Sequence, residues 1–273
     1  MKAISGALPA ADAMPKAKAA ALKALEIDNT LAEAHTSLAQ ITANYEWNWD
    51  KAEMEYRKAI ELNPNSSTGH HYFGTFLMGM GRHAEALEEM KRAQELDPLS
   101  PIIATFIGKA FDYAAKNDEA IQQYEKVLAS DPSFPVARTF LLRSLEQAGR
   151  LEEAIAQAKI VASQAGSSTD RAEAVEAAYR TAGPTGYWKE ILRQQATGKS
   201  RGPDSDLDIA GIYVKLRDQD STFRLLDRAC TARNMWLMNL KVDPRWDTLR
   251  SDPRFESLLL RVGLATRSEA QTR

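Results

Sequence analysis

The sequence predicts an all-α protein, a right-handed superhelical solenoid of antiparallel helix pairs. Three observations support this prediction. First, Pro64, Pro98 and Pro132 close three similar segments and lie 34 residues apart. Second, small and large residues recur at helical spacing within each segment. Third, Gly81 and Gly149 fall where the two helices of a pair would meet, and glycine adopts the left-handed backbone of such a turn at little cost.

The second helix of each segment has a regular pattern of side-chain sizes. A small residue is followed by a large one four positions later, and then by another small or β-branched residue. The three sets are Ala52/Tyr56/Ala59, Ala86/Met90/Ala93 and Ala120/Tyr124/Val127. Small side chains let two helices approach closely, and large ones fill the space between pairs. The closing proline then ends the second helix, because proline cannot continue it.

On these residues and this period the chain resembles the tetratricopeptide repeat family. The resemblance implies a partial amino-terminal repeat over 1–31, with its second helix at about 15–28, and four well-formed units over 32–166. Two degenerate units follow over 167–234, with a loop at 198–206, and then C-terminal cap helices and a tail over 235–273. An array that begins on half a unit exposes an apolar face. We therefore expect the chain to be the carboxy-terminal part of a longer protein.

Composition excludes several classes of function. The formal net charge is −2, so the chain lacks the basic surface expected of a nucleic-acid-binding protein. No apolar run approaches the ~18 residues of a membrane span, and no secretory signal is visible. The single cysteine, Cys230, excludes an intrachain disulfide and fits a reducing compartment. The sequence therefore predicts a cytoplasmic protein that binds neither nucleic acid nor membrane.

Candidate catalytic patterns are weak. Gly79–Ala84 matches a loose dinucleotide-binding pattern and Gly198–Ser200 resembles a phosphate loop, but neither follows a predicted strand. The four histidines lack metal-ligand spacing, and Cys230 falls at a packing position. Trp47 and Trp49 flank an extra residue in the turn of the first unit. We expect their rings to pack on neighbouring helices rather than to contact a ligand. The sequence thus predicts no enzyme, no cofactor and no metal.

The family resemblance implies that the first helix of each unit lines a concave groove that binds a protein or peptide partner. The inward positions of the first helices supply the candidate partner-binding residues. They are Thr36, Gln40, Asn44, His71, Thr75, Met78, Thr105, Lys109, Asp112, Tyr113, Thr139, Arg143 and Gln147.

One subtype of the family clamps carboxy-terminal carboxylates with lysine, arginine and asparagine. The corresponding pairs here are Thr36/Gln40, His71/Thr75 and Thr105/Lys109. Among these residues Lys109 alone offers a fixed positive charge. We therefore expect no carboxylate clamp in this chain.

The tail contains Asp-Pro-Arg-aromatic twice, at Asp243–Trp246 and Asp252–Phe255, and is predicted to cap the last unit. It also resembles the end of repeat regions in bacterial multidomain signalling proteins. The sequence therefore predicts a non-catalytic protein-protein interaction scaffold, a module of a larger bacterial signalling protein. The alternative is a self-association module that forms a homodimer; enzymatic activity ranks third.

Overall fold

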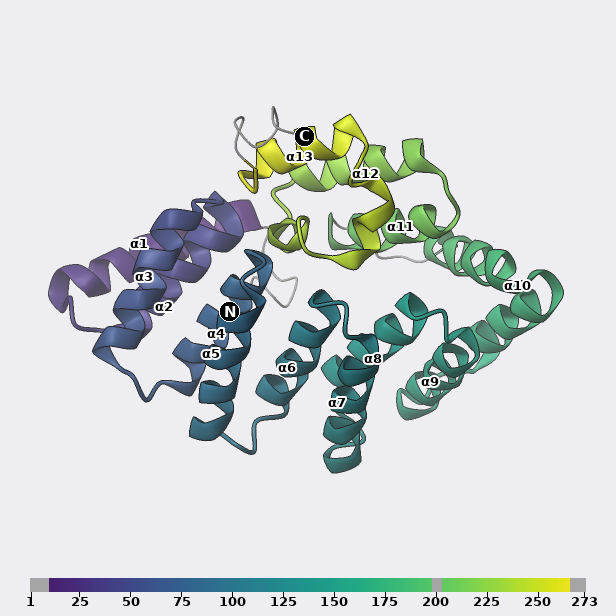
Figure 1. Cartoon of the computed structure of the whole chain (residues 1–273), viewed down its shortest axis with the longest axis horizontal. Coiled ribbons are helices and arrows are strands. Elements are labelled where there is room, and N and C mark those ends of the chain that lie inside the picture. The colour runs from purple at the N-terminus through teal and green to yellow at the C-terminus, as the bar shows by residue number, and fades with distance from the viewer. Residues whose placement is uncertain (1–9, 198–202, 266–273) are drawn as a thin grey trace. The chain divides into compact units, whose positions relative to one another are not determined.

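A computed structural model describes residues 10–197 and 203–265, which form helices joined by turns and contain no strand (Figure 1). The chain divides into two compact units. Unit 1 comprises Met1–Leu99, Arg233–Val242 and Leu259–Arg273, and unit 2 comprises Ser100–Ala232 and Asp243–Leu258. Within each unit, consecutive helices pack side by side as pairs. This confirms the all-α helical repeat fold that the sequence predicts.

Unit 1 is built from two helix pairs preceded by a single long helix. Its elements are α1 (Ala10–Ile27), α2 (Ala32–Ile41), the π-helix η1 (Thr42–Glu46), α3 (Trp49–Leu62), α4 (Ser67–Gly79), α5 (His83–Leu96) and the 3₁₀-helix η2 (Met235–Asn239). α1 begins well before residue 15, so the predicted amino-terminal helix is longer than its sequence pattern indicates. Residues 1–9 lie outside the described part.

Close packing within unit 1 depends on small residues at the predicted positions. A Cβ atom on Gly74 of α4 would lie 3.1 Å from the Ala86 carbonyl oxygen and from the Met90 side chain of α5. Ala86, Met90 and Ala93 are all fully buried. The small-large-small pattern therefore marks the contact surface between the helices of a pair.

The extra residue in the first unit is accommodated as a π-helix. Residues Thr42–Glu46 continue α2 with a wider turn, and Trp47 follows with a left-handed backbone at φ 55°. A π-turn absorbs one additional residue without breaking the helix. Asn48 then caps α3, because its side-chain oxygen accepts a hydrogen bond from the Lys51 amide.

Unit 2 continues the pattern of helix pairs. Its elements are α6 (Pro101–Tyr113), α7 (Asn117–Ser130), α8 (Pro135–Gln147), α9 (Leu151–Gln164), α10 (Asp170–Thr197), α11 (Pro203–Lys215), α12 (Gln219–Thr231), the 3₁₀-helix η3 (Pro244–Leu249) and α13 (Pro253–Val262), whose last residues belong to unit 1. Pro101 and Pro135 each occupy the first turn of their helix, where the missing amide hydrogen is not needed.

α10 is two helices that meet at a bend. Ala182 and Gly183 leave the helical region, with Gly183 at φ 58°, and Pro184 starts the next segment. This bend lies inside the first degenerate unit, where a turn between two helices is expected. α11 begins at Pro203, within the range 198–206 that the sequence predicts as a loop; residues 198–202 lie outside the described part.

A bridging side chain recurs early in the first helices. In α4, His70 Nδ1 lies 2.5 Å from Glu89 Oε2 of α5, and its Nε2 lies 3.0 Å from the Pro64 carbonyl oxygen. In α8, Arg138 makes the equivalent contacts, donating to Gln157 at 2.7 Å and to the Pro132 carbonyl oxygen at 2.5 Å. Each of these two side chains thus joins its own helix to the next helix and to the preceding turn.

The carboxy-terminal segment packs against helices far from it in sequence. In unit 1, Arg233 donates to the Tyr45 carbonyl oxygen at 3.0 Å and lies over the Trp47 ring, 5.1 Å from its centroid. In unit 2, Arg254 pairs with Asp220 of α12 at 2.8 Å. The contact with α12 places part of the tail against the last repeat-like helix pair, whereas the contact with η1 has no counterpart in the repeat pattern.

Candidate functional site

The threonines at the predicted groove positions share one local arrangement. Each hydroxyl donates a hydrogen bond to the carbonyl oxygen four residues earlier in its own helix. The distances are 3.0 Å for Thr36, 2.9 Å for Thr75, 2.6 Å for Thr105 and 2.9 Å for Thr139. Because the hydroxyl hydrogen is used within the helix, the two that reach the surface, Thr75 and Thr139, offer a partner an acceptor oxygen and a methyl group.

The candidate partner-binding residues differ widely in exposure. Five are buried: Thr36, His71, Met78, Thr105 and Lys109. Six are half-buried: Gln40, Asn44, Thr75, Asp112, Tyr113 and Gln147. Two are exposed: Thr139 and Arg143. The buried members shape the surface from beneath, and the exposed and half-buried members are within a partner's reach.

In unit 2 the residues Lys109 and Tyr113 of α6 and Arg143 of α8 form what we call the α6/α8 face. The Lys109 ammonium lies among three aromatic rings, 5.4 Å from the centroid of Phe106, 5.3 Å from Tyr113 and 4.9 Å from Phe140. Burial, together with the nearby charge of Arg143, lowers the pKa of Lys109 to about 7. Burial thus makes Lys109 a weaker source of fixed positive charge than its residue type alone predicts.

Asp112 is a structural link between three helices. One of its carboxylate oxygens accepts a hydrogen bond from the Tyr124 hydroxyl of α7 at 2.6 Å, and the other accepts one from Ser144 of α8 at 2.6 Å. Burial raises the pKa of Asp112 to about 6, against the opposing effect of these two hydrogen bonds. Asp112 therefore holds α6, α7 and α8 together.

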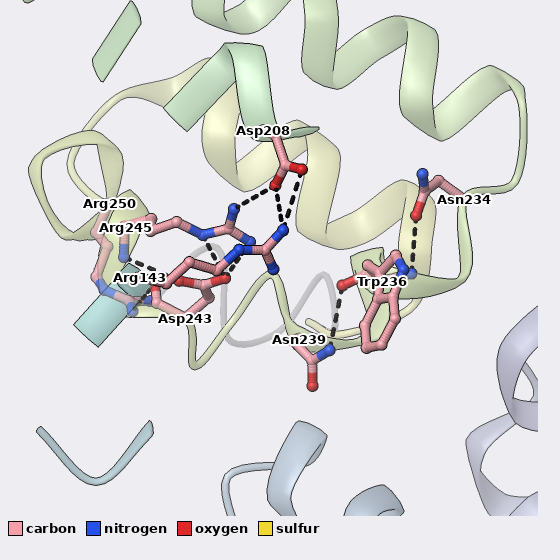
Figure 2. Close-up of polar contacts among 8 residues, drawn as sticks. All are labelled: Arg143, Asp208, Asn234, Trp236, Asn239, Asp243, Arg245 and Arg250. Carbon is pink, nitrogen blue, oxygen red and sulfur yellow. Dashed lines mark hydrogen bonds and ion pairs between the residues drawn. The ribbon is translucent and has the colours of Figure 1, made fainter. Parts of the chain in front are cut away.

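Ion pairs extend the α6/α8 face toward α11 and the tail (Figure 2). Arg143 Nη2 donates to both carboxylate oxygens of Asp208 of α11, each at 3.0 Å. Arg245 approaches the same carboxylate, with Nη1 3.5 Å from Oδ1, and its Nη2 lies 2.6 Å from Oδ2 of Asp243. One aspartate of α11 thus receives a guanidinium from α8 and another from the tail.

Asp243 is buried but stays ionised. Burial acts to raise its pKa, whereas the charge and hydrogen bonds of Arg245 and the charge of Lys109 hold that pKa below its usual value. Burial and, after it, the charge of Asp243 raise the pKa of Tyr113, so Asp243 lies within electrostatic range of both α6 residues of the face. The chain's own tail therefore lies at the face that the sequence assigns to a partner.

Asp243 and Arg245 are the site residues that repeat-based reasoning did not find. Their Asp-Pro-Arg motif was visible in the sequence but was assigned to a cap on the last unit. The half-exposed pair of Arg143 and Asp208 gives the site its accessible charges, with 44% and 46% of the side-chain surface exposed. The arrangement can pair with charged groups of a ligand; it does not place a nucleophile beside a base.

Within residues 10–197 and 203–265, no group of three or more histidine, cysteine, aspartate or glutamate side chains is arranged to hold a metal ion. None of the helices in those ranges combines the length and the apolar character needed to span a membrane.

The tetratricopeptide repeat family matches residues 73–98 and 107–169. A crystallised tetratricopeptide repeat protein from Parabacteroides merdae superposes with a TM-score of 0.59 at 11% identity, over 92% of each chain. PilW, a widely conserved type IV pilus biogenesis factor, superposes with a TM-score of 0.53 at 20% identity, over 91% of this chain and 94% of its own. Curated proteins gave no match.

The solved structures share the fold with this chain, and the family matches fall on the helix pairs α4/α5, α6/α7 and α8/α9. Arrays of this kind are protein-interaction scaffolds. The chain therefore contains tetratricopeptide repeats of the kind that serve as scaffolds for protein interactions.

Proposed function

We propose that this chain is a non-catalytic scaffold that binds a peptide or protein on the inward faces of its first helices. The observation that supports this most is the exposure of Thr139 and Arg143 on α8, beside the half-buried Asp112 and Tyr113 of α6. A cation, an acceptor oxygen and an aromatic ring then line one surface, which suits a segment with both polar and apolar side chains.

The experiment introduces a bulky cation into the binding surface. Thr139→Arg adds a long charged side chain at an exposed position of α8, and Ala129→Arg adds the same group at an exposed position of α7, a second helix. A partner captured from the native lysate and identified is then titrated against both variants by biolayer interferometry. Thr139→Arg is expected to weaken binding at least about tenfold through steric exclusion, and Ala129→Arg to leave it unchanged. Equal binding by both variants would exclude this surface.

Self-association is the second candidate function. Leu22 and Ile27 of α1 and Leu31 after it are large apolar residues with 39%, 80% and 37% of their surface exposed. Such side chains in one region favour contact with another apolar surface. We expect light scattering of the wild-type chain to report a dimer that Ile27→Lys converts to a monomer; a monomer at every concentration would exclude this function. A place within a larger bacterial signalling protein stays a prediction of the sequence resemblance.

A further inference from the structure

The turn at Asp243–Trp246 is a self-contained element. Asp243 Oδ1 accepts a hydrogen bond from the Arg245 amide at 3.0 Å, and Oδ2 accepts from the Arg245 guanidinium at 2.9 and 2.6 Å. Pro244 fixes the backbone between them. Trp246 then enters the interior with 2% of its surface exposed. The aspartate therefore holds the arginine in position while the tryptophan anchors the turn.

The same element occurs a second time in the tail. Asp252 accepts from the Arg254 amide at 2.9 Å and from its guanidinium at 2.8 Å, and Phe255 is buried at 1% exposure. Arg254 pairs with Asp220 of α12 at 2.8 Å and lies 4.1 Å from the Phe223 ring centroid. One recognition chemistry is thus used twice: an aspartate on a helix of unit 2 receives the arginine of an Asp-Pro-Arg-aromatic turn.

The face that receives the first turn has complementary charges. Asp208 of α11 offers a carboxylate to the guanidinium of Arg245, and its other contacts go to Arg143. The positive charge of Lys109 favours the ionised form of Asp243 and therefore lowers the pKa of that carboxyl group. The arginine of the turn therefore meets a group of opposite charge on α11, and its aspartate lies within range of the partly protonated amine of Lys109 on α6.

We propose that the α6/α8 face, with Asp208, is a binding site for an Asp-Pro-Arg-aromatic turn, and that residues 243–246 are its internal occupant. The ligand class is a partner segment in which an acidic residue stands two positions before an arginine and an aromatic residue follows. The aromatic residue is needed because a segment that displaces the internal turn must refill the volume left by Trp246. This inference rests on the proposed scaffold function and names the class of partner.

The ion pair that joins the arginine of the internal turn to Asp208 can be exchanged for the same ion pair with a partner's arginine. Arg143 and Asp208 are both about half exposed, so solvent screens their ion pairs, and exposed ion pairs contribute little to stability. Most hydrogen bonds of the turn are internal to it and move with it. An incoming turn that brings its own internal hydrogen bonds, and an aromatic residue for the buried position of Trp246, can therefore replace it by re-forming the same few contacts.

The test uses the full chain and a fluorescent peptide with the sequence of residues 240–250, measured by fluorescence anisotropy. Arg245→Ala removes the internal guanidinium and leaves the α6/α8 face intact. We expect this variant to bind the peptide up to about fivefold more tightly than the wild type, the change that corresponds to the competitor losing one exposed ion pair. The same peptide with alanine in place of the arginine that corresponds to Arg245 should not bind.

Two protein controls assign the gain to this face. Arg228→Ala removes an exposed guanidinium of α12 that pairs with the buried Asp206 of α11, away from Asp208, and should bind the peptide as the wild type does. Adding Asp208→Asn to Arg245→Ala should abolish the gain, because the peptide arginine loses its acceptor. If circular dichroism shows that Arg245→Ala does not fold, Arg245→Lys replaces it, with a smaller gain expected.

A folded Arg245 variant that binds the peptide no better than the wild type would overturn the inference. So would a gain that survives Asp208→Asn. These failures are distinguishable from failure of the scaffold function, which is tested by Thr139→Arg with a whole partner and without the peptide.

Discussion

The indole nitrogen of Trp49 donates a hydrogen bond to the backbone carbonyl oxygen of Val262, and the two atoms lie 3.2 Å apart. The two residues are 213 positions apart in the sequence and belong to the same compact unit. The nearby Trp47 is a natural contrast, because its buried indole nitrogen has no hydrogen-bond partner among the described residues. The two tryptophans of one turn thus differ in whether the indole nitrogen has a hydrogen-bond acceptor.

Replacing each tryptophan with phenylalanine should separate that interaction from ring packing. Both changes remove part of a ring, but only Trp49→Phe removes a hydrogen bond, which contributes about 1 kcal/mol to the free energy of unfolding. Urea denaturation should therefore show Trp49→Phe to be the less stable variant by about that amount. Equal stability of the two variants would mean that the tail does not depend on this bond.

Gly108 should tolerate no side chain. A Cβ atom there would lie 2.6 Å from a ring carbon of Tyr124, so the ring would have to move. Gly108→Ala is expected to lower the free energy of unfolding by about 1–3 kcal/mol through overpacking between α6 and α7.

Gly211 of α11 provides the matched control for that substitution. An added Cβ would meet only ordinary contacts there, the nearest at 3.6 Å. Alanine is a better helix former than glycine by up to about 1 kcal/mol, so Gly211→Ala should leave stability unchanged or raise it. Thermal unfolding followed by circular dichroism distinguishes the two variants, and a destabilised Gly211→Ala would contradict the packing described for α11.

His70 and His83 should give the protein opposite pH dependences. Burial acts to lower the pKa of His70, but its hydrogen bonds to Glu89 and to the Pro64 carbonyl raise it overall. The stabilisation from His70 is therefore fully present below the unfolded pKa of about 6.5 and is lost as pH rises through the folded value. His70→Gln should then cost about 1 kcal/mol more at pH 5.5 than at pH 8.

His83 supplies the contrast in the same unit. Burial lowers its pKa, so its charged form is disfavoured in the folded state and its contribution to stability grows as pH rises toward 6.5. His83→Gln should thus be less harmful, or even stabilising, at low pH. Denaturation curves at pH 5.5 and 8 check both signs, and parallel behaviour of the two variants would contradict the assigned environments.

Glu146 should make the protein less stable as the solution becomes neutral. Burial raises its pKa to about 7, although the Tyr187 hydroxyl donates to it at 2.6 Å. A carboxyl group with a raised folded pKa binds more protons when folded, so stability falls as pH rises from about 4.5 to 7. Glu146→Gln keeps an acceptor for Tyr187 and removes the charge, and should raise the free energy of unfolding at pH 8 by about 1–2 kcal/mol.

The control for Glu146→Gln is Glu119→Gln, an exposed glutamate in the first turn of α7. This change should alter stability by less than about 0.5 kcal/mol at either pH. A gain at pH 8 that appears equally at pH 4.5 would show that the Glu146 charge is not its origin.

The sequence by itself determined the helix pairs and their contact surfaces. Ala86, Met90 and Tyr124 are fully buried where the period places them. These positions are readable because each is set by neighbours three, four or 34 residues away, and periodic spacing carries that information.

The tertiary structure decided what occupies the α6/α8 face. Asp243 and Arg245 reach that face through contacts with residues distant in the sequence, and the repeat period does not predict such contacts. The sequence does not predict the pKa of Lys109 either. A pKa near 7 comes from burial among Phe106, Tyr113 and Phe140 and not from the residue type. Local spacing therefore determined the scaffold, and long-range packing determined the chemistry of its surface.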